Sequence, residues 1–372
     1  MRIGIDVGRV LHGDGGVAAY TRRLVTALAK HGGAQEIVLF DLDRGTGDRR
    51  VFEAAFGGLR EQVDIGAAAS NDLQSLDIFH APGFRMPPIG APGHIFTLHD
   101  LTALSHPHFH KLDNRVRSLT STSQALARGA TILAVSQATR SEAVRLLALP
   151  QERIEVVPPI LDQHFTAQSN SDFDEERLER IGVEGPYVLA VASLEPRKNF
   201  SRLLDAWDVL SDDLKDAHQL VVVASAQWLQ GAVRRRLAKL RRSGSVLLLK
   251  DVPTPELAAL YRGARTLVFP SLAEGFGLPV AEAMACGAPV VTSHRSSMPE
   301  VADGAAVLVD PEDASSIADG LERVLADQSL RRDLRERGFE SAARFTAEAV
   351  VPRLIEVYAR SVSRSRVGLK HV

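Results

Sequence analysis

The chain has 372 residues, a length that favours two domains at roughly 150 residues each. Its 44 lysines and arginines nearly balance 46 aspartates and glutamates, which argues against a nucleic-acid partner. The single cysteine excludes an intrachain disulfide. No apolar run reaches the roughly 18 residues that span a bilayer, and the N-terminus shows no signal-peptide pattern. We therefore expect a cytoplasmic protein, with any membrane contact peripheral and on the inner face of the plasma membrane.

Short apolar runs alternate with helical patterns along the chain. The runs lie at 3–7, 37–40, 95–98, 131–135, 154–157, 187–192, 220–224, 246–249, 266–269, 289–292 and 306–309. Helical spacing occurs at 18–30, 118–128, 137–147, 202–210 and 279–285. Because the runs are continuous rather than alternating, they indicate strands covered on both faces, as in a parallel sheet. The pattern predicts an α/β fold.

The alternation breaks once, in a polar and acidic stretch. We interpret 166–185 as a linker between two Rossmann-like domains, an N-terminal one at 1–165 and a C-terminal one at 186–345. The last segment, 346–372, begins with a helical pattern. Open α/β sheets bind ligands beyond the carboxyl ends of their strands, so we expect a cleft there and the chemistry in the loops that follow the strands.

The most informative motif is EGFGLPVAEAMACGAP, which begins at Glu274 after the buried run at 266–269. Gly275 and Gly277 allow the backbone to approach a ligand closely, and the amides at the start of the next helix suit an anion. Glu274 and Glu282 lie eight residues apart, about 12 Å at helical rise. That separation suits the two ends of one extended ligand that carries hydroxyl pairs. A helix-end charge and a solvated glutamate are the alternative.

A second motif, SLEPRKNF, begins at Ser193 directly after the run at 187–192. Arg197 and Lys198 are expected in a short loop before a helix. A guanidinium fork, an ammonium charge and helix-end amides together suit a diphosphate. An exposed basic turn is the better explanation of an Arg-Lys pair alone, but the acidic motif on the same domain favours the diphosphate site.

Two weaker motifs lie in the N-terminal half. Gly15 and Gly16 open a helix, which suits phosphate or acceptor contact, although a plain tight turn explains this motif better when it is taken alone. His99 and Asp100 follow the run at 95–98 and form a pair that can contact a sugar hydroxyl or assist proton movement. A histidine bonded to a loop carbonyl is the alternative. We expect no metal site, because the histidine-rich stretch at 106–110 lacks cysteine and paired glutamate.

Together these motifs resemble those of the family-4 retaining glycosyltransferases with the GT-B fold. Glu274 and Glu282 match the E-x7-E signature of that family, and SLEPRKN is similar to its donor-phosphate turn. The segment TLHD at 97–100 is similar to a subgroup often found in lipopolysaccharide and exopolysaccharide clusters. The similarity covers nearly the whole chain. It implies two Rossmann-like domains that face a central cleft, with the C-terminal helix crossing back to the N-terminal domain.

The resemblance also implies roles for the matching residues. Glu282 would bind the ribose, Glu274 the donor sugar, and Arg197 and Lys198 the diphosphate. The expected donor site comprises Ser193, Arg197, Lys198, Glu274, Gly275, Phe276, Gly277, Leu278 and Glu282. The expected acceptor and phosphate loop comprises Gly15, Gly16 and Asp100, and the catalytic candidates are Glu274, His99 and Lys198. Ala192 and Ser193 stand where many members carry Gly-Arg, which leaves open whether Arg197 replaces the missing arginine.

The implied activity is a retaining hexosyltransferase in surface polysaccharide biosynthesis. It would move a sugar from a nucleoside diphosphate sugar to a hydroxyl of a glycan or lipid-linked acceptor, and the subgroup favours GDP-mannose. The nucleotide sugar is a co-substrate, and no cofactor is expected. The alternatives are a GT-B-fold nucleotide-sugar epimerase and a non-catalytic sugar-nucleotide-binding protein. The basic helical face at 234–242 is the candidate for a peripheral membrane contact, with a solvated surface as the alternative.

Overall fold

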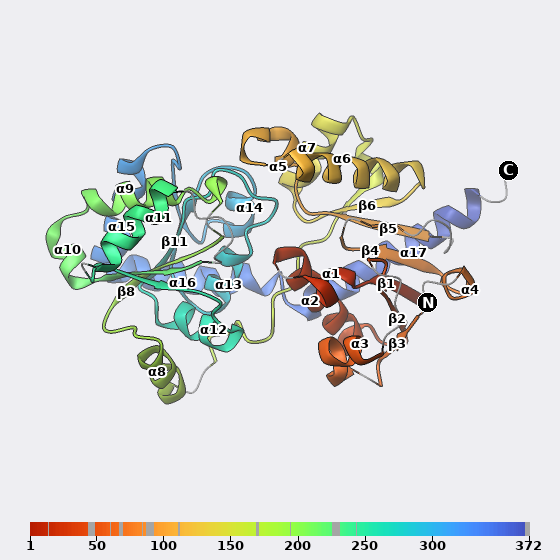
Figure 1. The fold of residues 1–372 in the computed structure, drawn as a ribbon, viewed down its shortest axis with the longest axis horizontal. Coiled ribbons are helices and arrows are strands. Elements are labelled where there is room, and N and C mark those ends of the chain that lie inside the picture. The colour runs from red at the N-terminus through yellow and green to blue at the C-terminus, as the bar shows by residue number, and fades with distance from the viewer. Residues whose placement is uncertain are drawn as a thin grey trace. The chain divides into compact units, whose positions relative to one another are not determined.

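The computed structural model describes residues 1–13, 15–43, 49–59, 61–66, 70–83, 85–86, 93–110, 112–168, 171–193, 195–224, 231–242 and 244–368. The chain forms two compact units (Figure 1). Unit 1 comprises Met1–Ile160 together with Phe345–Val372, and unit 2 comprises Leu161–Arg344. Each unit is built around one parallel sheet, which confirms the predicted α/β class.

The sheet of unit 1 has seven strands in the order β3-β2-β1-β4-β5-β6-β7. The strands are β1 (Arg2–Asp6), β2 (Glu36–Phe40), β3 (Val63–Ile65), β4 (Ile78–Ala81), β5 (Gly93–Leu98), β6 (Thr131–Ala134) and β7 (Ile154–Val156). The helices are α1 (Gly8–His12), α2 (Gly16–His31), α3 (Arg49–Phe56), α4 (Ser70–Gln74), α5 (Thr102–Ser105), α6 (Leu112–Ala127), α7 (Gln137–Leu147) and α17 (Ala347–Gly368). The strand order reverses direction at β1, which creates a switch point between β1 and β4.

The sheet of unit 2 has six strands in the order β10-β9-β8-β11-β12-β13. They are β8 (Tyr187–Val191), β9 (Gln219–Val223), β10 (Val246–Leu249), β11 (Thr266–Phe269), β12 (Val290–Ser293) and β13 (Val307–Val309). The helices are α8 (Ser171–Arg180), α9 (Phe200–Val209), α10 (Asp212–Ala217), α11 (Gly231–Arg242), α12 (Thr254–Gly263), α13 (Leu278–Ala285), α14 (Met298–Ala302), α15 (Ala314–Ala326) and α16 (Gln328–Ala343). This is the Rossmann order, with its switch point between β8 and β11.

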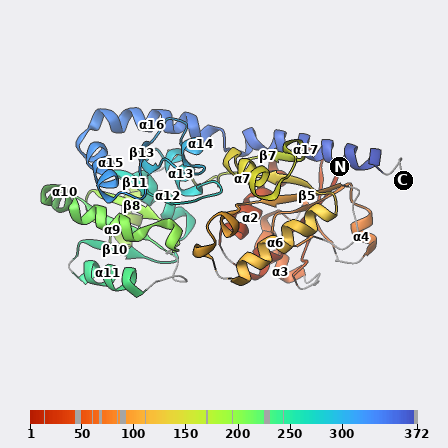
Figure 2. The same ribbon diagram turned by 90° about the horizontal axis from the view of Figure 1, so that it is seen from above.

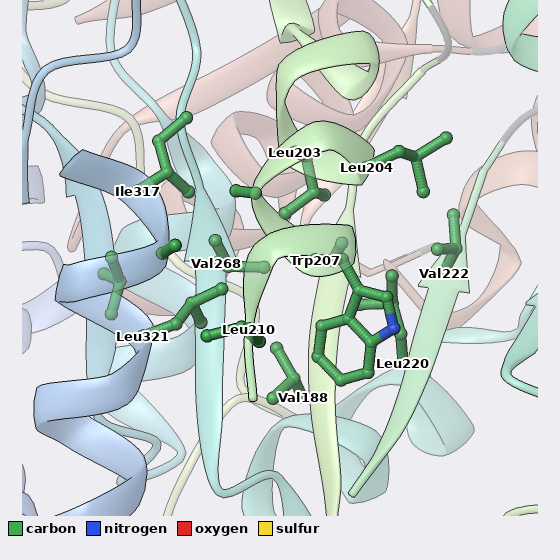
Figure 3. Packing of buried hydrophobic residues seen from close by; sticks show 14 of the residues in the cluster. Val188, Leu203, Leu204, Trp207, Leu210, Leu220, Val222, Val268, Ile317 and Leu321 are labelled. Carbon is green, nitrogen blue, oxygen red and sulfur yellow. The ribbon is translucent and has the colours of Figure 1, made fainter. Parts of the chain in front are cut away.

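The core of unit 2 lies between its sheet and two helices on one face. Figure 3 shows Trp207 of α9 lying over the sheet, with Val188, Leu220 and Val268 pointing toward it and Leu321 of α15 beside them. These side chains are at most 2% exposed. Burial of each such large apolar side chain contributes about 1.5–3 kcal/mol, so this layer fixes the sheet on which the loops of unit 2 are mounted.

The last helix joins unit 1, although the segment before it belongs to unit 2. Helix α17 packs on β4, β5 and α2 (Figure 2). A buried polar network ties it there: His80 Nδ1 lies 2.6 Å from the Tyr358 hydroxyl, and His80 Nε2 lies 2.7 Å from Thr97 Oγ1. Burial lowers the pKa of His80 to about 3, so the imidazole is neutral and both contacts are hydrogen bonds. The expected return of the C-terminal helix to the N-terminal sheet is therefore observed.

Two parts of the fold differ from the sequence prediction. All the predicted runs form strands, but β3 and β4 are additional; β3 has only three residues, and the histidine in β4 interrupts its apolar pattern. The segment interpreted as a linker contains α8 and belongs to unit 2. Asp174 of α8 binds Arg262 of α12 through two hydrogen bonds of 2.5 and 2.7 Å, an ion pair between segments far apart in sequence that no local pattern reveals.

The His80–Tyr358 contact predicts a measurable loss on removal of one hydroxyl. Tyr358→Phe leaves a buried ring nitrogen of His80 without its partner, which should cost about 1–3 kcal/mol of the free energy of unfolding of unit 1 in urea denaturation. Tyr20→Phe is the matched control, because its hydroxyl lies 3.4 Å from Thr97 and contributes less. Equal losses in the two variants would contradict the assigned role of the network.

Candidate functional site

The loops that follow β8 and β11 meet at the switch point of unit 2. These two strands are parallel neighbours, with Val188 opposite Thr266. Beyond the strands, the Leu272 amide donates to the Arg197 carbonyl at 2.8 Å, and Arg197 Nη1 donates to the Ala273 carbonyl at 3.2 Å. The two strongest sequence motifs are therefore brought together by direct hydrogen bonds.

A buried carboxylate lies at the centre of this junction. Glu274 is 8% exposed. Its Oε2 accepts from Arg197 Nη1 at 2.7 Å, and its Oε1 accepts from Lys198 Nζ at 2.5 Å. Ser271 Oγ also donates to Oε1, at 2.7 Å. Both cations come from one short turn, Pro196–Lys198, so adjacent residues hold the two oxygens of one carboxylate.

The cations determine the protonation state of this carboxylate. Burial alone raises the pKa of Glu274, but the charges of Arg197 and Lys198 outweigh it, and the pKa falls to about 2. Burial lowers the pKa of Lys198, against the opposing attraction of Glu274. Near neutral pH Glu274 is ionised, so it can accept hydrogen bonds but has no proton to donate.

A second carboxylate extends the cluster. Glu195 Oε2 accepts from Arg197 Nε at 2.8 Å, and Glu195 Oε1 accepts from Ser193 Oγ at 2.9 Å. Arg197 therefore contacts both Glu195 and Glu274. Arg197 lies between two carboxylates, so its charge is already shared with Glu195 and Glu274. It therefore has less charge to offer a diphosphate in place of the arginine that this chain lacks.

The chain between Glu274 and α13 is shaped by one glycine. Gly277 has a φ of 101°, and a Cβ placed on it would clash with Met298 Cε. Ser297 Oγ donates to the Phe276 carbonyl at 2.7 Å, and Ser296 Oγ donates to the Glu274 carbonyl at 2.5 Å. These contacts hold the backbone of Gly275, Phe276, Gly277 and Leu278 in the turn that opens α13.

Glu282 lies on the same helix, in a separate environment. It is 5% exposed, and the Tyr261 hydroxyl of α12 donates to its Oε2 at 3.0 Å. The two glutamates of the E-x7-E motif thus have different partners, a hydroxyl for Glu282 and two cations for Glu274.

Sequence reasoning missed three residues that position the site. Asn199 adopts a left-handed conformation, and its Nδ2 donates to the carbonyls of Pro270 and Pro311 at 3.0 and 2.6 Å. Ser271 and Tyr261 contact the two glutamates directly. Of these three residues, only Asn199 could have been singled out from the sequence, because it directly follows Arg197 and Lys198 in the motif. Serine and tyrosine are too common for the sequence to single out these two positions.

In unit 1, His99 and Asp100 have separate hydrogen-bond partners, and His99 bonds a loop carbonyl as in the alternative interpretation. His99 Nε2 donates to the Pro82 carbonyl at 2.7 Å. Burial lowers the pKa of His99, against the opposing effects of the Pro82 carbonyl and Asp100, so the ring is neutral. Asp100 Oδ1 accepts from the amide and hydroxyl of Thr102 at 3.0 and 2.6 Å and thereby caps α5.

The glycine turn of unit 1 begins α2. Gly15 is the residue before the helix, with a φ of 103°, and Gly16 is the first helical residue. A Cβ on either glycine would meet nothing within 4 Å. The turn lies between α1 and α2, in the connection that follows β1 at the switch point of unit 1. It is open, and this connection leaves the edge of the sheet where ligands bind in this class of fold.

Unit 1 also carries a groove of about 670 Å³ along α6. Leu42 and Met86 line one side, and Leu112, Val116 and Arg117 of α6 line the other. Leu112 and Val116 are 68% and 54% exposed, which is unusual for neighbouring aliphatic side chains on one helix face. The groove combines an apolar surface with charges of both signs, because Asp113 lines it together with Arg85 and Arg117.

The described residues offer neither a metal-binding cluster nor a membrane span. Within the described ranges, no three His, Cys, Asp or Glu side chains come close enough together to hold a metal ion. No helix in the described part of the chain is both long and apolar enough to cross a membrane.

The glycine turn before α13 yields a stability prediction. Gly277→Ala combines an unfavourable backbone conformation with a clash against Met298, and should cost about 2–5 kcal/mol in urea unfolding of unit 2. The control is Gly182→Ala, because Gly182 has a φ of 81° but a Cβ at this position would meet nothing within 4 Å. Gly182→Ala should lose only the free energy that the left-handed backbone conformation costs a residue with a side chain, about 1–2 kcal/mol. Equal losses of unfolding free energy in the two variants would show that the packing of Met298 does not require a glycine at position 277.

Two family descriptions match the chain. "Glycosyl transferases group 1" matches residues 172–341, and "Glycosyltransferase Family 4" matches residues 14–165. "O-antigen chain mannosyltransferase B" of Escherichia coli is 32% identical over 283 residues, which are 76% of this chain and 74% of that protein. "Serotype-specific mannosyltransferase WbdA" of Escherichia coli is 29% identical over 64% of this chain, but the match covers only 30% of WbdA.

The solved structures agree on the fold. The Anabaena protein HepE, determined in complex with UDP-glucose, superimposes with a TM-score of 0.73 at 17% identity, covering 97% of this chain and 100% of that one. At this identity the likeness concerns the fold alone. The motif-based prediction of family and fold is confirmed: the chain belongs to the group 1 glycosyltransferases, has the GT-B fold, and is a hexosyltransferase.

Proposed function

We propose that this enzyme transfers mannose from GDP-mannose to a hydroxyl of a glycan or lipid-linked acceptor during surface polysaccharide biosynthesis, with retention of anomeric configuration. The observation that carries the proposal is the contact of Glu274 with Arg197 and Lys198 at the switch point of unit 2. The names of the relatives, an O-antigen chain mannosyltransferase and a serotype-specific mannosyltransferase, support mannose and a polysaccharide product.

The donor diphosphate is assigned to the turn that carries Arg197 and Lys198. Lys198 has three N–H donors, and Glu274 takes one of them, so the ammonium group can bind a phosphate oxygen without leaving the carboxylate. Ser193 and the backbone amides of Phe276, Gly277 and Leu278 complete the assignment. Amides at a helix start and a nearby ammonium group together favour the negative charge of a diphosphate.

The two glutamates are assigned to hydroxyl groups of the donor. Glu274 stays ionised far below neutral pH, so it accepts hydrogen bonds from the sugar and does not act as an acid. Glu282, which already accepts from the Tyr261 hydroxyl, is assigned to the ribose. Both roles use a carboxylate as a hydrogen-bond acceptor, and neither requires a proton to be shared between them.

The proposed reaction breaks the bond between the anomeric carbon and the diphosphate oxygen, and forms a bond from that carbon to the acceptor oxygen. Negative charge grows on the leaving diphosphate, and Lys198 and Arg197 stabilise it. The acceptor proton passes to a leaving phosphate oxygen, because Glu274 is paired with two cations and is a weak base. This same-face exchange gives retention without a covalent sugar–enzyme intermediate.

The acceptor is assigned to unit 1. Gly15 and Gly16 offer an open turn, and the unprotonated Nδ1 of neutral His99 can accept a hydroxyl hydrogen bond because Nε2 is used by Pro82. Asp100 is assigned to position the loop, since its carboxylate caps α5. Exposed Leu112 and Val116 in the α6 groove favour a lipid-linked acceptor. Equal transfer to the same glycan with and without its lipid would contradict that assignment.

We also propose a peripheral membrane contact through the basic face of α11, without Arg236. Arg236 binds Asp205 and Asp208 of α9 and is committed to the unit itself. The exposed members of the basic face are Arg234, Arg235, Lys239, Arg241 and Arg242. Unchanged sedimentation with anionic vesicles after these charges are neutralised would contradict this contact.

A thermal-shift comparison tests the donor assignment. GDP, UDP, ADP and their sugars are added to the wild type, to Glu282→Ala and to the control Glu322→Ala, whose glutamate is exposed on α15. A ligand at 100 times its Kd stabilises the native state by about 2.7 kcal/mol. We expect guanine nucleotides to raise the Tm of the wild type and of the control, and this rise to collapse in Glu282→Ala. No shift at millimolar nucleotide would contradict the assignment.

A further inference from the structure

A pocket of about 250 Å³ lies at the amino ends of β11 and β12 in unit 2. This is the sheet edge opposite to the loops that carry Glu274 and Lys198. Its lining includes five arginines, namely Arg262, Arg265, Arg331, Arg332 and Arg335. The described lining contains no aspartate or glutamate. The pocket is therefore strongly positive, although the chain as a whole is close to neutral.

Helix α16 supplies three of the five arginines through its spacing. Residues 331, 332 and 335 recur three and four positions apart, so they share one helix face. Asp333 lies on another face and pairs with Arg337. Asp333 thus neutralises a different arginine, and Glu336, next to Arg335 in the sequence, forms no ion pair with Arg332 or Arg335 in the described part of the chain.

Two of the arginines are committed to the protein. Arg262 binds Asp174 through Nε and Nη2 at 2.5 and 2.7 Å. Arg331 Nη1 donates to the carbonyls of Val324 and Leu325 at 2.7 and 2.6 Å, which ties α16 to the end of α15. These contacts hold two sides of the pocket in place. They also leave the guanidinium groups of Arg262 and Arg331 less available to a ligand.

The other three arginines have no such partner. The guanidinium groups of Arg265, Arg332 and Arg335 are exposed and form no ion pair or hydrogen bond with the described part of the chain. Arg335 lies over the ring of Phe339, 5.6 Å from its centre. Like charges gathered in one pocket repel one another, and a bound anion removes that cost.

Gly287, which lines the pocket, lies beside Arg335. Gly287 has a φ of 80°, and a Cβ on it would lie 3.0 Å from Arg335 Nε and 2.7 Å from Phe339 Cζ. Only a residue without a side chain lets Arg335 and Phe339 pack against this loop. The glycine therefore leaves room for the Arg335 and Phe339 side chains beside this loop.

The size and chemistry of the pocket indicate the class of ligand. Guanidinium forks match the oxygens of a phosphate group in pairs. The volume is below the roughly 300–1,000 Å³ typical of sites for larger organic ligands. We propose that this pocket binds a phosphate group through Arg265, Arg332 and Arg335. The group can belong to a soluble phosphate or to a lipid headgroup. The site is independent of the proposed donor site, which lies at the other edge of the sheet.

Arginine footprinting tests the proposal at single residues. The intact protein is treated with phenylglyoxal, with and without inorganic phosphate, and modification is read by peptide mass spectrometry. At ten times Kd only about one site in eleven is empty, so modification of Arg332 and Arg335 should slow about tenfold. Arg22 of α2 and Arg353 of α17 are exposed and serve as the internal control, with no change expected.

A second arm identifies the source of the phosphate. Vesicles that contain phosphatidylglycerol are compared with vesicles of phosphatidylcholine alone. Protection by inorganic phosphate supports a soluble ligand, and protection by phosphatidylglycerol vesicles alone supports a headgroup. Calorimetric titration of phosphate into Arg332→Gln/Arg335→Gln should lose a binding event that Arg22→Gln/Arg353→Gln retains. Equal modification under every condition, with identical titrations of the two double variants, overturns the proposal.

Discussion

The ion pair between Glu274 and the two cations of the β8 loop is the interaction on which the site depends. A carboxylate that is 8% exposed would be strongly destabilised without partners. Arg197 and Lys198 supply them at 2.7 and 2.5 Å. Because the cations belong to one loop and the carboxylate to another, the pair fixes the distance between the two loops. The residues assigned to the sugar and to the diphosphate thereby become one structural unit.

The strand order brings the two loops of this ion pair to the same edge of the sheet. Strands β8 and β11 are neighbours, but the chain leaves them toward opposite sides of the sheet, which opens space at their carboxyl ends. Asn199 then ties the β8 loop to Pro270 and Pro311, so the loops after three strands share one hydrogen-bonding residue. The apolar layer beneath, built around Trp207, holds those strands in place.

The sequence predicted the fold well because buried parallel strands and helix starts have local signals. The continuous runs marked most strands, and the glycine turns before α2 and α13 were visible as motifs. The contacts that define the site were not visible. That Ser271 touches Glu274, or that His99 bonds Pro82 instead of Asp100, depends on which loops meet in space. Helix α8 escaped prediction for the same reason, since its ion pair with Arg262 joins residues 88 positions apart.

In the proposed donor complex, Lys198 contacts the diphosphate while it remains bound to Glu274. The most direct test is the ³¹P NMR spectrum of GDP in the presence of the wild type, of Lys198→Met and of the control Lys215→Met on α10. We expect the β-phosphorus resonance to move on binding to the wild type and to the control, and most of this change to be lost in Lys198→Met. The same change in all three proteins would contradict this contact.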